Sequence, residues 1–353
     1  MKKVYLKVYV NCNLGDDIFI YMITKRYQKI KFQLLTYKNY DVNYNGNLEV
    51  KRYNFIRKIA NKLIILFSNG NNSLENWQMK KSRLTVLIGG SMFMENTSNS
   101  RKYFIGGGQP YYILGSNFGP YKTRKYFERF HNIFSNAKDV CFRDENSYNL
   151  FKDLSNVRKA SDIIFGLDVN KYKNKTTNNV VISVVDCNLK VGQEYKNTYE
   201  NKIIELINLF HSQNYSVTLM SFCKAEGDED AIESIMNKLS KTNDVNTYFY
   251  EGNIDEALNI IGSCQIVVGT RFHANILGLI MNKTIIPIAY SDKTLNALKD
   301  INFNGRIFDI RDMDKFDVFS ITKDDLDYKC DVSNQIVNSE KHFQELDEIL
   351  GRD

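Results

Sequence analysis

Apolar residues in the first half of the chain form short runs that alternate with longer stretches of helical periodicity. The apolar runs predict strands at residues 4–10, 32–36, 84–88, 112–114 and 139–143. The amphipathic stretches predict helices at residues 18–27, 55–67, 124–134 and 145–154. Strands that alternate with helices in this way are typical of a parallel sheet covered by helices on both faces.

The same alternation restarts after residues 168–178, a polar stretch rich in lysine and asparagine that we interpret as an interdomain linker. The second series predicts strands at residues 179–185, 216–221, 248–250, 264–268 and 284–289. Its predicted helices are at residues 202–211, 230–239, 254–261 and 274–280. A final amphipathic helix is expected at residues 334–350.

These patterns predict an α/β protein with two Rossmann-like domains, at residues 1–168 and 179–333. Open parallel sheets bind ligands at the carboxyl ends of their strands, so two such domains in tandem predict a central cleft. The last segment, residues 334–353, is free in this interpretation to pack back on the N-terminal domain.

The composition narrows the class of protein. Lys and Arg exceed Asp and Glu by 47 − 41 = 6 over 353 residues, and the basic residues are scattered, so we expect no nucleic-acid partner. No apolar run is long enough for a membrane span, and the N-terminus lacks the features of a signal peptide. The six cysteines are widely spaced, so we expect a cytoplasmic protein without a metal site. The small positive charge is compatible with peripheral contact with the inner face of an anionic membrane.

The segment with the most chemical information follows the predicted strand at 264–268. Arg271 and His273 lie between that strand and a predicted helix, and Lys293 follows the next strand in a predicted loop. A strand end next to a helix N-terminus favours an anion, Arg can pair bidentately with a carboxylate or phosphate, and His titrates near neutrality. We therefore predict a cationic pocket. The alternative is that Arg271 and Lys293 are surface residues and His273 caps the helix.

Polar residues also follow the strands of the first domain. The first turn contains Asp16, which is either a helix cap or a functional carboxylate. Arg143 directly ends the strand at 139–143, where it either reaches the cleft or pairs with Asp144 or Glu145. The remaining candidate ligand-binding positions at this edge are Asn13, Gly15, Gly90, Ser91, Ser116 and Asn117.

Together these segments resemble the polysaccharide pyruvyl transferase family. The resemblance rests on NLGDDIFI, VLIGGSMF, ILGSNFGP and CFRDENSY, and most specifically on VVGTRFHANILGL followed by PIAYSDKT. It extends from about residue 8 to about residue 300. It implies a GT-B-like fold, and the transfer of pyruvate from phosphoenolpyruvate to two hydroxyls of a sugar as a ketal. It also implies that Arg143, Arg271, His273 and Lys293 bind phosphoenolpyruvate.

The chemistry of that reaction fits these residue types. Phosphoenolpyruvate carries a carboxylate and a phosphate, so its binding needs several cations. Ketal formation needs a proton donor, for which His273 is our candidate, and Asp16 is a weaker candidate for stabilising a cationic carbon. We expect no cofactor and no metal, with the donor bound by the second domain. The acceptor, bound by the first domain, would be a sugar or a lipid-linked oligosaccharide of exopolysaccharide or capsule biosynthesis.

Two other functions stay open. One is a nucleotide-sugar glycosyltransferase of GT-B type, which would use Arg271 and Lys293 to bind a diphosphate. The other is a non-catalytic subunit of a glycan assembly complex. The acceptor sugar and the ketal positions are not readable from the sequence. If His273 is not the acid or base, the next histidine to consider is His131, in the predicted helix at 124–134.

Overall fold

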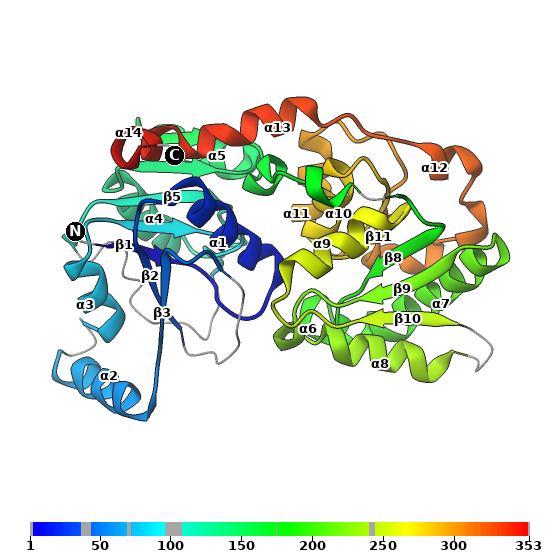
Figure 1. Ribbon diagram of the computed structural model, residues 1–353, viewed down its shortest axis with the longest axis horizontal. Helices are drawn as coiled ribbons and strands as arrows, with labels where there is room; N and C mark the ends of the chain where they lie inside the picture. The colour runs from blue at the N-terminus through cyan, green and yellow to red at the C-terminus, as the bar shows by residue number, and fades with distance from the viewer. Residues whose placement is uncertain are drawn as a thin grey trace. The chain divides into compact units, whose positions relative to one another are not determined.

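The computed structural model describes residues 3–36, 44–68, 72–95, 108–173, 175–239 and 244–351. The chain divides into two compact units (Figure 1). The first comprises Met1–Val10, Asp16–Ile163 and Val337–Asp353, and the second comprises Asn11–Gly15 and Ile164–Ile336. The chain therefore enters the second unit briefly near its N-terminus, which no pattern in the sequence predicted.

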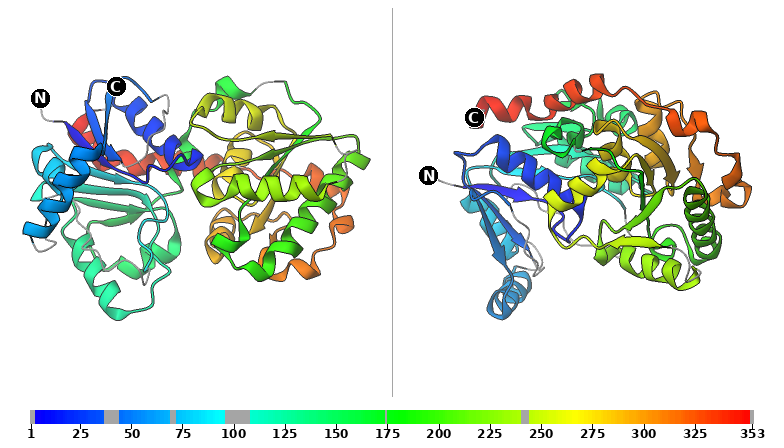
Figure 2. Two further views of the ribbon diagram at one scale, coloured as in Figure 1. Left: turned by 90° about the horizontal axis from the view of Figure 1, so that it is seen from below. Right: turned by 45° about the vertical axis from the view of Figure 1, so that its right-hand side comes forward.

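The first unit is built on a seven-stranded sheet in the order β3-β2-β1-β4-β5-β6-β7, and all its strand pairs are parallel. The inner strands β4 (Thr85–Ile88) and β6 (Asp139–Phe142) are buried at every position, because helices lie on both faces of the sheet (Figure 2). The strands are β1 Val4–Lys7, β2 Phe32–Thr36, β3 Leu48–Arg52, β4 Thr85–Ile88, β5 Tyr111–Ser116, β6 Asp139–Phe142 and β7 Val157–Lys159.

The helices of the first unit begin with recognisable caps. Asn54, Ser73, Thr123 and Asp144 each accept a backbone N–H from the first turn of the helix that follows. The helices are α1 Leu14–Arg26, α2 Phe55–Phe67, α3 Leu74–Lys81, α4 Arg124–Ser135 and α5 Glu145–Phe151.

The C-terminal segment belongs to the first unit from Val337 onward. Instead of one continuous helix at 334–350, the structure has α13 at Ser333–Ser339, a 3₁₀ turn at Glu340–Phe343 and α14 at Gln344–Leu350. This segment is fixed by apolar packing, because Phe343 and Leu346 are buried.

The second unit has a six-stranded parallel sheet in the order β10-β9-β8-β11-β12-β13. Its core joins the inner strands to the long helix α7 and to the segment that follows β13. The strands are β8 Asn179–Ser183, β9 Ser216–Met220, β10 Val245–Tyr248, β11 Ile266–Gly269, β12 Thr284–Ala289 and β13 Phe308–Asp309. The helices are α6 Cys187–Lys190, α7 Lys196–Ser212, α8 Asp228–Lys238, α9 Ile254–Ser263, α10 Phe272–Ile280, α11 Asp292–Asp300 and α12 Lys323–Asp327.

The predicted α/β class, with two parallel sheets and flanking helices, is confirmed. The passage from the first unit to the second lies at residues 163 and 164, before the polar stretch at 168–178 that we interpreted as a linker. Part of that stretch is packed, because the buried Tyr172 lies against Gly262 of α9. None of the helices in the described part of the chain has the length and apolar character needed to cross a bilayer.

Candidate active site

Three strand ends of the first unit bring the predicted polar residues together. Gly90 and Ser91 follow β4, Asn117 follows β5 and Arg143 follows β6. The turns are tied to one another by the backbone, since Asn117 N donates to Gly90 O at 3.1 Å and Arg143 N donates to Ser116 O at 3.1 Å. The Ser116 hydroxyl donates to Gly89 O at 2.8 Å, which fixes a further contact between the ends of β4 and β5.

Arg143 is the charged centre of this edge. Its side chain is only 3% exposed and donates through Nη1 to Asp162 Oδ2 at 2.8 Å and through Nη2 to Asn117 Oδ1 at 2.8 Å. The Ser91 hydroxyl donates to the same Asn117 oxygen at 3.1 Å. Gly90 leaves room for the guanidinium, because a Cβ at that position would lie 2.7 Å from Nη1. The guanidinium is therefore held in one orientation.

Two of the sequence interpretations for this edge are corrected. Arg143 pairs with Asp162, whereas Asp144 caps α5 and Glu145 pairs with Lys159. Asp16 is not the helix cap, because α1 begins at Leu14 and places Asp16 in its first turn. The Asp16 carboxylate is nearly buried and lies next to Gly89, whose Cβ would be 3.8 Å from Oδ1.

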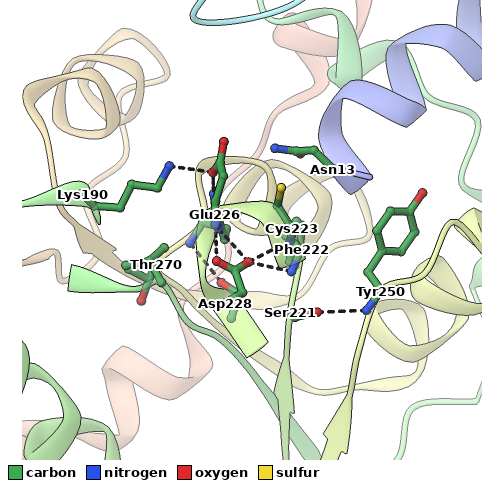
Figure 3. A network of polar contacts seen from close by, with 12 residues as sticks. Asn13, Lys190, Ser221, Phe222, Cys223, Glu226, Asp228, Tyr250 and Thr270 are labelled. Carbon is green, nitrogen blue, oxygen red and sulfur yellow. Dashed lines mark hydrogen bonds and ion pairs between the residues drawn. The ribbon is translucent and has the colours of Figure 1, made fainter. Parts of the chain in front are cut away.

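In the second unit, Arg271 is held by two carboxylates, those of Glu226 and Asp228, which are labelled in Figure 3. Its Nε donates to Asp228 Oδ2 at 2.9 Å, Nη2 donates to Asp228 Oδ1, and Nη1 donates to Glu226 Oε2. Burial opposes the charge on Arg271, but the two carboxylates outweigh it and raise the pKa of the guanidinium above its ordinary value. Arg271 therefore stays protonated.

The carboxylates are themselves well supported. Asp228 is fully buried, and its Oδ2 also accepts the backbone N–H groups of Phe222 at 2.8 Å and Cys223 at 2.9 Å. Glu226 accepts from Lys190 Nζ at 2.6 Å. Burial raises the pKa of Glu226, but Arg271 and Lys190 outweigh it and lower the pKa to about 2. The two carboxylates and the two cations form one network of ion pairs. Removal of any one of these four side chains would leave another with an uncompensated charge.

His273 lies in the first turn of α10, which begins at Phe272, two residues earlier than the sequence predicted. Its ring is 5.2 Å from that of Phe272, and Lys293 Nζ lies 4.7 Å from the centre of the same Phe272 ring. Lys293 is not in a loop as predicted, because it falls in the first turn of α11. His273 and Lys293 are both half-buried.

The turn between β1 and α1 completes this side of the second unit. Asn13 pairs with Cys223 in an isolated antiparallel bridge, and both residues are labelled in Figure 3. Asn13 Oδ1 accepts the N–H of Gly15 at 3.1 Å. Asn13 thus caps α1, the role that the sequence had left to Asp16. A Cβ on Gly15 would lie 1.8 Å from Nδ1 of His273, so the imidazole packs directly on the glycine.

Each unit therefore presents an arginine that a buried aspartate orients at the carboxyl end of a parallel sheet. The second unit adds an imidazole and an ammonium group next to its arginine, a combination that can bind an anion and transfer a proton. Within the described residues, no group of three His, Cys, Asp or Glu side chains could hold a metal ion.

The sequence located these strand ends but missed the acids that hold the arginines, Asp162, Glu226 and Asp228. Asp162 lies 19 residues after Arg143, and Asp228 precedes Arg271 by 43. A signal for Asp228 was available, because an acidic run follows the predicted strand at 216–221 and so falls at the sheet edge of Arg271.

Comparisons with known proteins identify the family and the fold of the chain. Residues 13–292 match the pattern of the family described as polysaccharide pyruvyl transferase. The amylovoran biosynthesis protein AmsJ of Erwinia amylovora is 18% identical over 351 residues, covering 86% of this chain and 83% of AmsJ. The crystal structure of HepE from Anabaena, in complex with UDP and glucose, matches with a TM-score of 0.53 at 11% identity and covers 99% of both chains. The likeness to HepE confirms the predicted GT-B-like fold.

Proposed function

This chain belongs to the polysaccharide pyruvyl transferase family, and on that basis we propose that it transfers pyruvate from phosphoenolpyruvate to a pair of sugar hydroxyls as a ketal. The family supports the coarser statement, a transferase of polysaccharide biosynthesis. Ten of the eleven candidate residues fall within the matched residues 13–292, and Lys293 follows directly.

The observation that carries the proposal is the grouping of Arg271, His273 and Lys293. Phosphoenolpyruvate presents a carboxylate and a phosphate within a few ångströms, so it needs cations that are close together and fixed. Within the described part of the chain, Asp228 and Glu226 accept hydrogen bonds from three of the five N–H groups of Arg271. The other two N–H groups can donate to an anion. Lys293 would supply a second cation.

The proposed reaction balances with no other reactant. The methylene carbon of phosphoenolpyruvate gains a proton from the imidazolium and becomes a methyl group. One sugar hydroxyl adds through its oxygen to the neighbouring carbon and gives its proton back to the imidazole. The second hydroxyl then displaces phosphate from that carbon, and its proton leaves with the phosphate. His273 would deliver the proton to the methylene carbon, and Asp16 would stabilise positive charge on the neighbouring carbon.

A nucleotide-sugar glycosyltransferase is the second candidate, because HepE shares the fold and was crystallised with UDP and glucose. Calorimetry and thermal unfolding with phosphoenolpyruvate and with UDP separate the two. A ligand at 100 times its Kd adds about 2.7 kcal/mol of stability, which a melting curve resolves. We expect stabilisation by phosphoenolpyruvate alone. Stabilisation by UDP alone would favour the glycosyltransferase, and binding of neither would favour a non-catalytic subunit.

The catalytic role is tested with membranes of the source organism as the supply of acceptor. We expect His273→Ala to lower the transfer of label from [¹⁴C]phosphoenolpyruvate by about 10²–10⁴-fold, with donor binding retained. His131→Ala is the matched control. His131 lies on α4 of the first unit, and its Nε2 is 2.7 Å from Asp153 Oδ2. A normal rate in His273→Ala together with a low rate in His131→Ala would transfer the role to His131. Loss of donor binding in His273→Ala would make it a ligand of the donor instead.

A further inference from the structure

The helix α2 exposes an unusual amount of apolar surface. Phe55 is 77% exposed and Phe67 is 83% exposed. At about 100° per residue, the exposed apolar side chains of one side fall within an arc of about 120°. They are Phe55, Ile56, Ile59, Leu63, Leu66 and Phe67. Monomeric proteins rarely leave so many large apolar side chains together in water, so this face is expected to have a partner.

The charged side chains of α2 itself are all of one sign. Lys58 and Lys62 are exposed, and because they are four residues apart they lie on the same edge of the apolar arc. Between residues 50 and 74 the sequence contains no aspartate or glutamate. A helix with an apolar face, flanking lysines and no acidic residue is complementary to the surface of a membrane that contains anionic lipids.

The place of α2 in the fold fits this partner. It follows the edge strand β3 and packs against α3, apart from the helices that cover the sheet (Figure 1). It is held from its inner side, where the buried Asn61 accepts the N–H of Leu74 at 2.8 Å. Its 13 residues are too few to span a bilayer, for which about 20 are needed. The helix can therefore lie along a membrane surface without unfolding the unit.

We propose that α2 is an interfacial anchor, whose apolar arc inserts among the lipids of an anionic bilayer while Lys58 and Lys62 contact the headgroups. This proposal does not depend on the reaction that the protein catalyses. The small positive net charge of the chain is compatible with peripheral membrane contact. The proposal assigns that contact to one helix of the first unit.

The test is flotation of the full chain with vesicles of phosphatidylcholine containing 30% phosphatidylglycerol, compared with phosphatidylcholine alone. We expect binding to the anionic vesicles that weakens as salt is raised. Lys58→Gln with Lys62→Gln should weaken it roughly 25-fold, since each cation near the surface contributes about fivefold. Phe55→Ser with Phe67→Ser should abolish binding at every salt concentration. Both pairs are exposed, so the melting temperature should stay unchanged.

The matched control is Phe319→Ser, which removes a phenylalanine that is 74% exposed on the second unit. It should bind vesicles like the wild type. The proposal would be overturned if Phe319→Ser lost as much vesicle binding as Phe55→Ser with Phe67→Ser, or if the wild-type chain did not bind the anionic vesicles. A wild-type dimer in light scattering that becomes a monomer in Phe55→Ser with Phe67→Ser, without vesicle binding, would show that the face joins two copies of the chain.

Discussion

At the scale of single residues, the contact between Gly15 and His273 is the most restrictive feature of the candidate site. The two residues are 258 positions apart, yet the imidazole lies where a Cβ of residue 15 would be. A side chain at position 15 would force the ring away, because no real Cβ approaches a ring nitrogen to 1.8 Å. The glycine thus determines where the proposed acid can be.

We expect Gly15→Ala to lower the proposed pyruvyl transfer about 100-fold, since displacing a catalytic group by about 1 Å can cost that much. Stability should change by no more than about 1 kcal/mol, because the ring can rotate away and alanine favours the helix by about that amount. Labelled transfer and thermal unfolding measure the two effects. Gly46→Ala is the control, since a Cβ there meets nothing within 4 Å. Full activity in Gly15→Ala would mean that catalysis does not need His273 in this position.

His342 should act as an acid-sensitive residue of the first unit. Its ring is fully buried, one nitrogen, Nε2, lies 2.8 Å from Ser161 O, and Nδ1 has no partner among the described residues. Burial, helped by nearby Arg158 and Arg143, lowers its pKa to about 3, against the hydrogen bond to Ser161. Since the folded pKa is lowered, its contribution is fully present above about pH 6.5 and is lost as the pH falls toward 3.

Between pH 6 and 4 the free energy of unfolding of the wild type should fall about 1.4 kcal/mol per pH unit more steeply than that of His342→Gln. Glutamine keeps a donor for Ser161 but does not titrate. Urea unfolding followed by the fluorescence of Trp77, the single tryptophan and part of the first unit, gives both slopes. Parallel slopes would show that His342 titrates alike in the folded and unfolded chain.

These cases show which residues a sequence can reveal. Arg143 was predictable because it directly follows a run of buried apolar residues, and Arg271 and His273 because they lie in the turn that follows another such run. Strand ends meet at one edge of a parallel sheet. Of the partners that orient the two arginines, Asp162 lies in a segment without such a position in the pattern, and Asp228 was indicated only by the acidic run after the predicted strand at 216–221. Long-range contacts of this kind depend on packing, which the periodicity of the chain does not encode.

At the scale of elements, the segment after Ile336 is essential to the first unit. It buries Phe343 and Leu346, and Arg26 of α1 pairs with Glu340 at 2.9 Å and also with Asp347. The Tyr27 hydroxyl donates to Asp347 at 2.7 Å. Apolar burial of the two side chains alone contributes roughly 3–6 kcal/mol, a large part of the stability of an ordinary domain.

Deletion of residues 337–353 should therefore unfold the first unit at much lower urea, as followed by Trp77 fluorescence. Leu346→Ala is the graded variant and should cost about 2–5 kcal/mol, because the side chain is fully buried. An unchanged urea midpoint after the deletion would mean that the segment covers the unit without stabilising it.

The elements themselves were largely predictable. Central strands such as β4 and β11 are continuous apolar runs, and α4 and α9 have clear periodicity with Thr123 and Asn253 as caps. The start of α10 was placed two residues too late, and α11 was not predicted, because Lys293 was assigned to a loop. Their helical conformation is set by the sheet that they cover.

At the scale of the whole molecule, both units use the same arrangement. A central strand ends in an arginine, and a buried aspartate from elsewhere in the same unit orients it, Asp162 for Arg143 and Asp228 for Arg271. An arginine held in this way is ready for a ligand without losing side-chain freedom on binding. The two parallel sheets could be predicted from the alternation of strands and helices alone. The arginine–aspartate pair that both units share could not.

Any exchange of the second unit between two members of the family would have to carry along a short piece from near the start of the chain. Asn11–Gly15 belongs to the second unit, although the chain before and after it belongs to the first. A chimera joined only at residues 163/164 and 336/337 would combine His273 of one parent with residue 15 of the other. It would also break the native match between Asn13 and Cys223. Recombination, in the laboratory or in evolution, therefore needs two further junctions around five residues to transfer this unit intact.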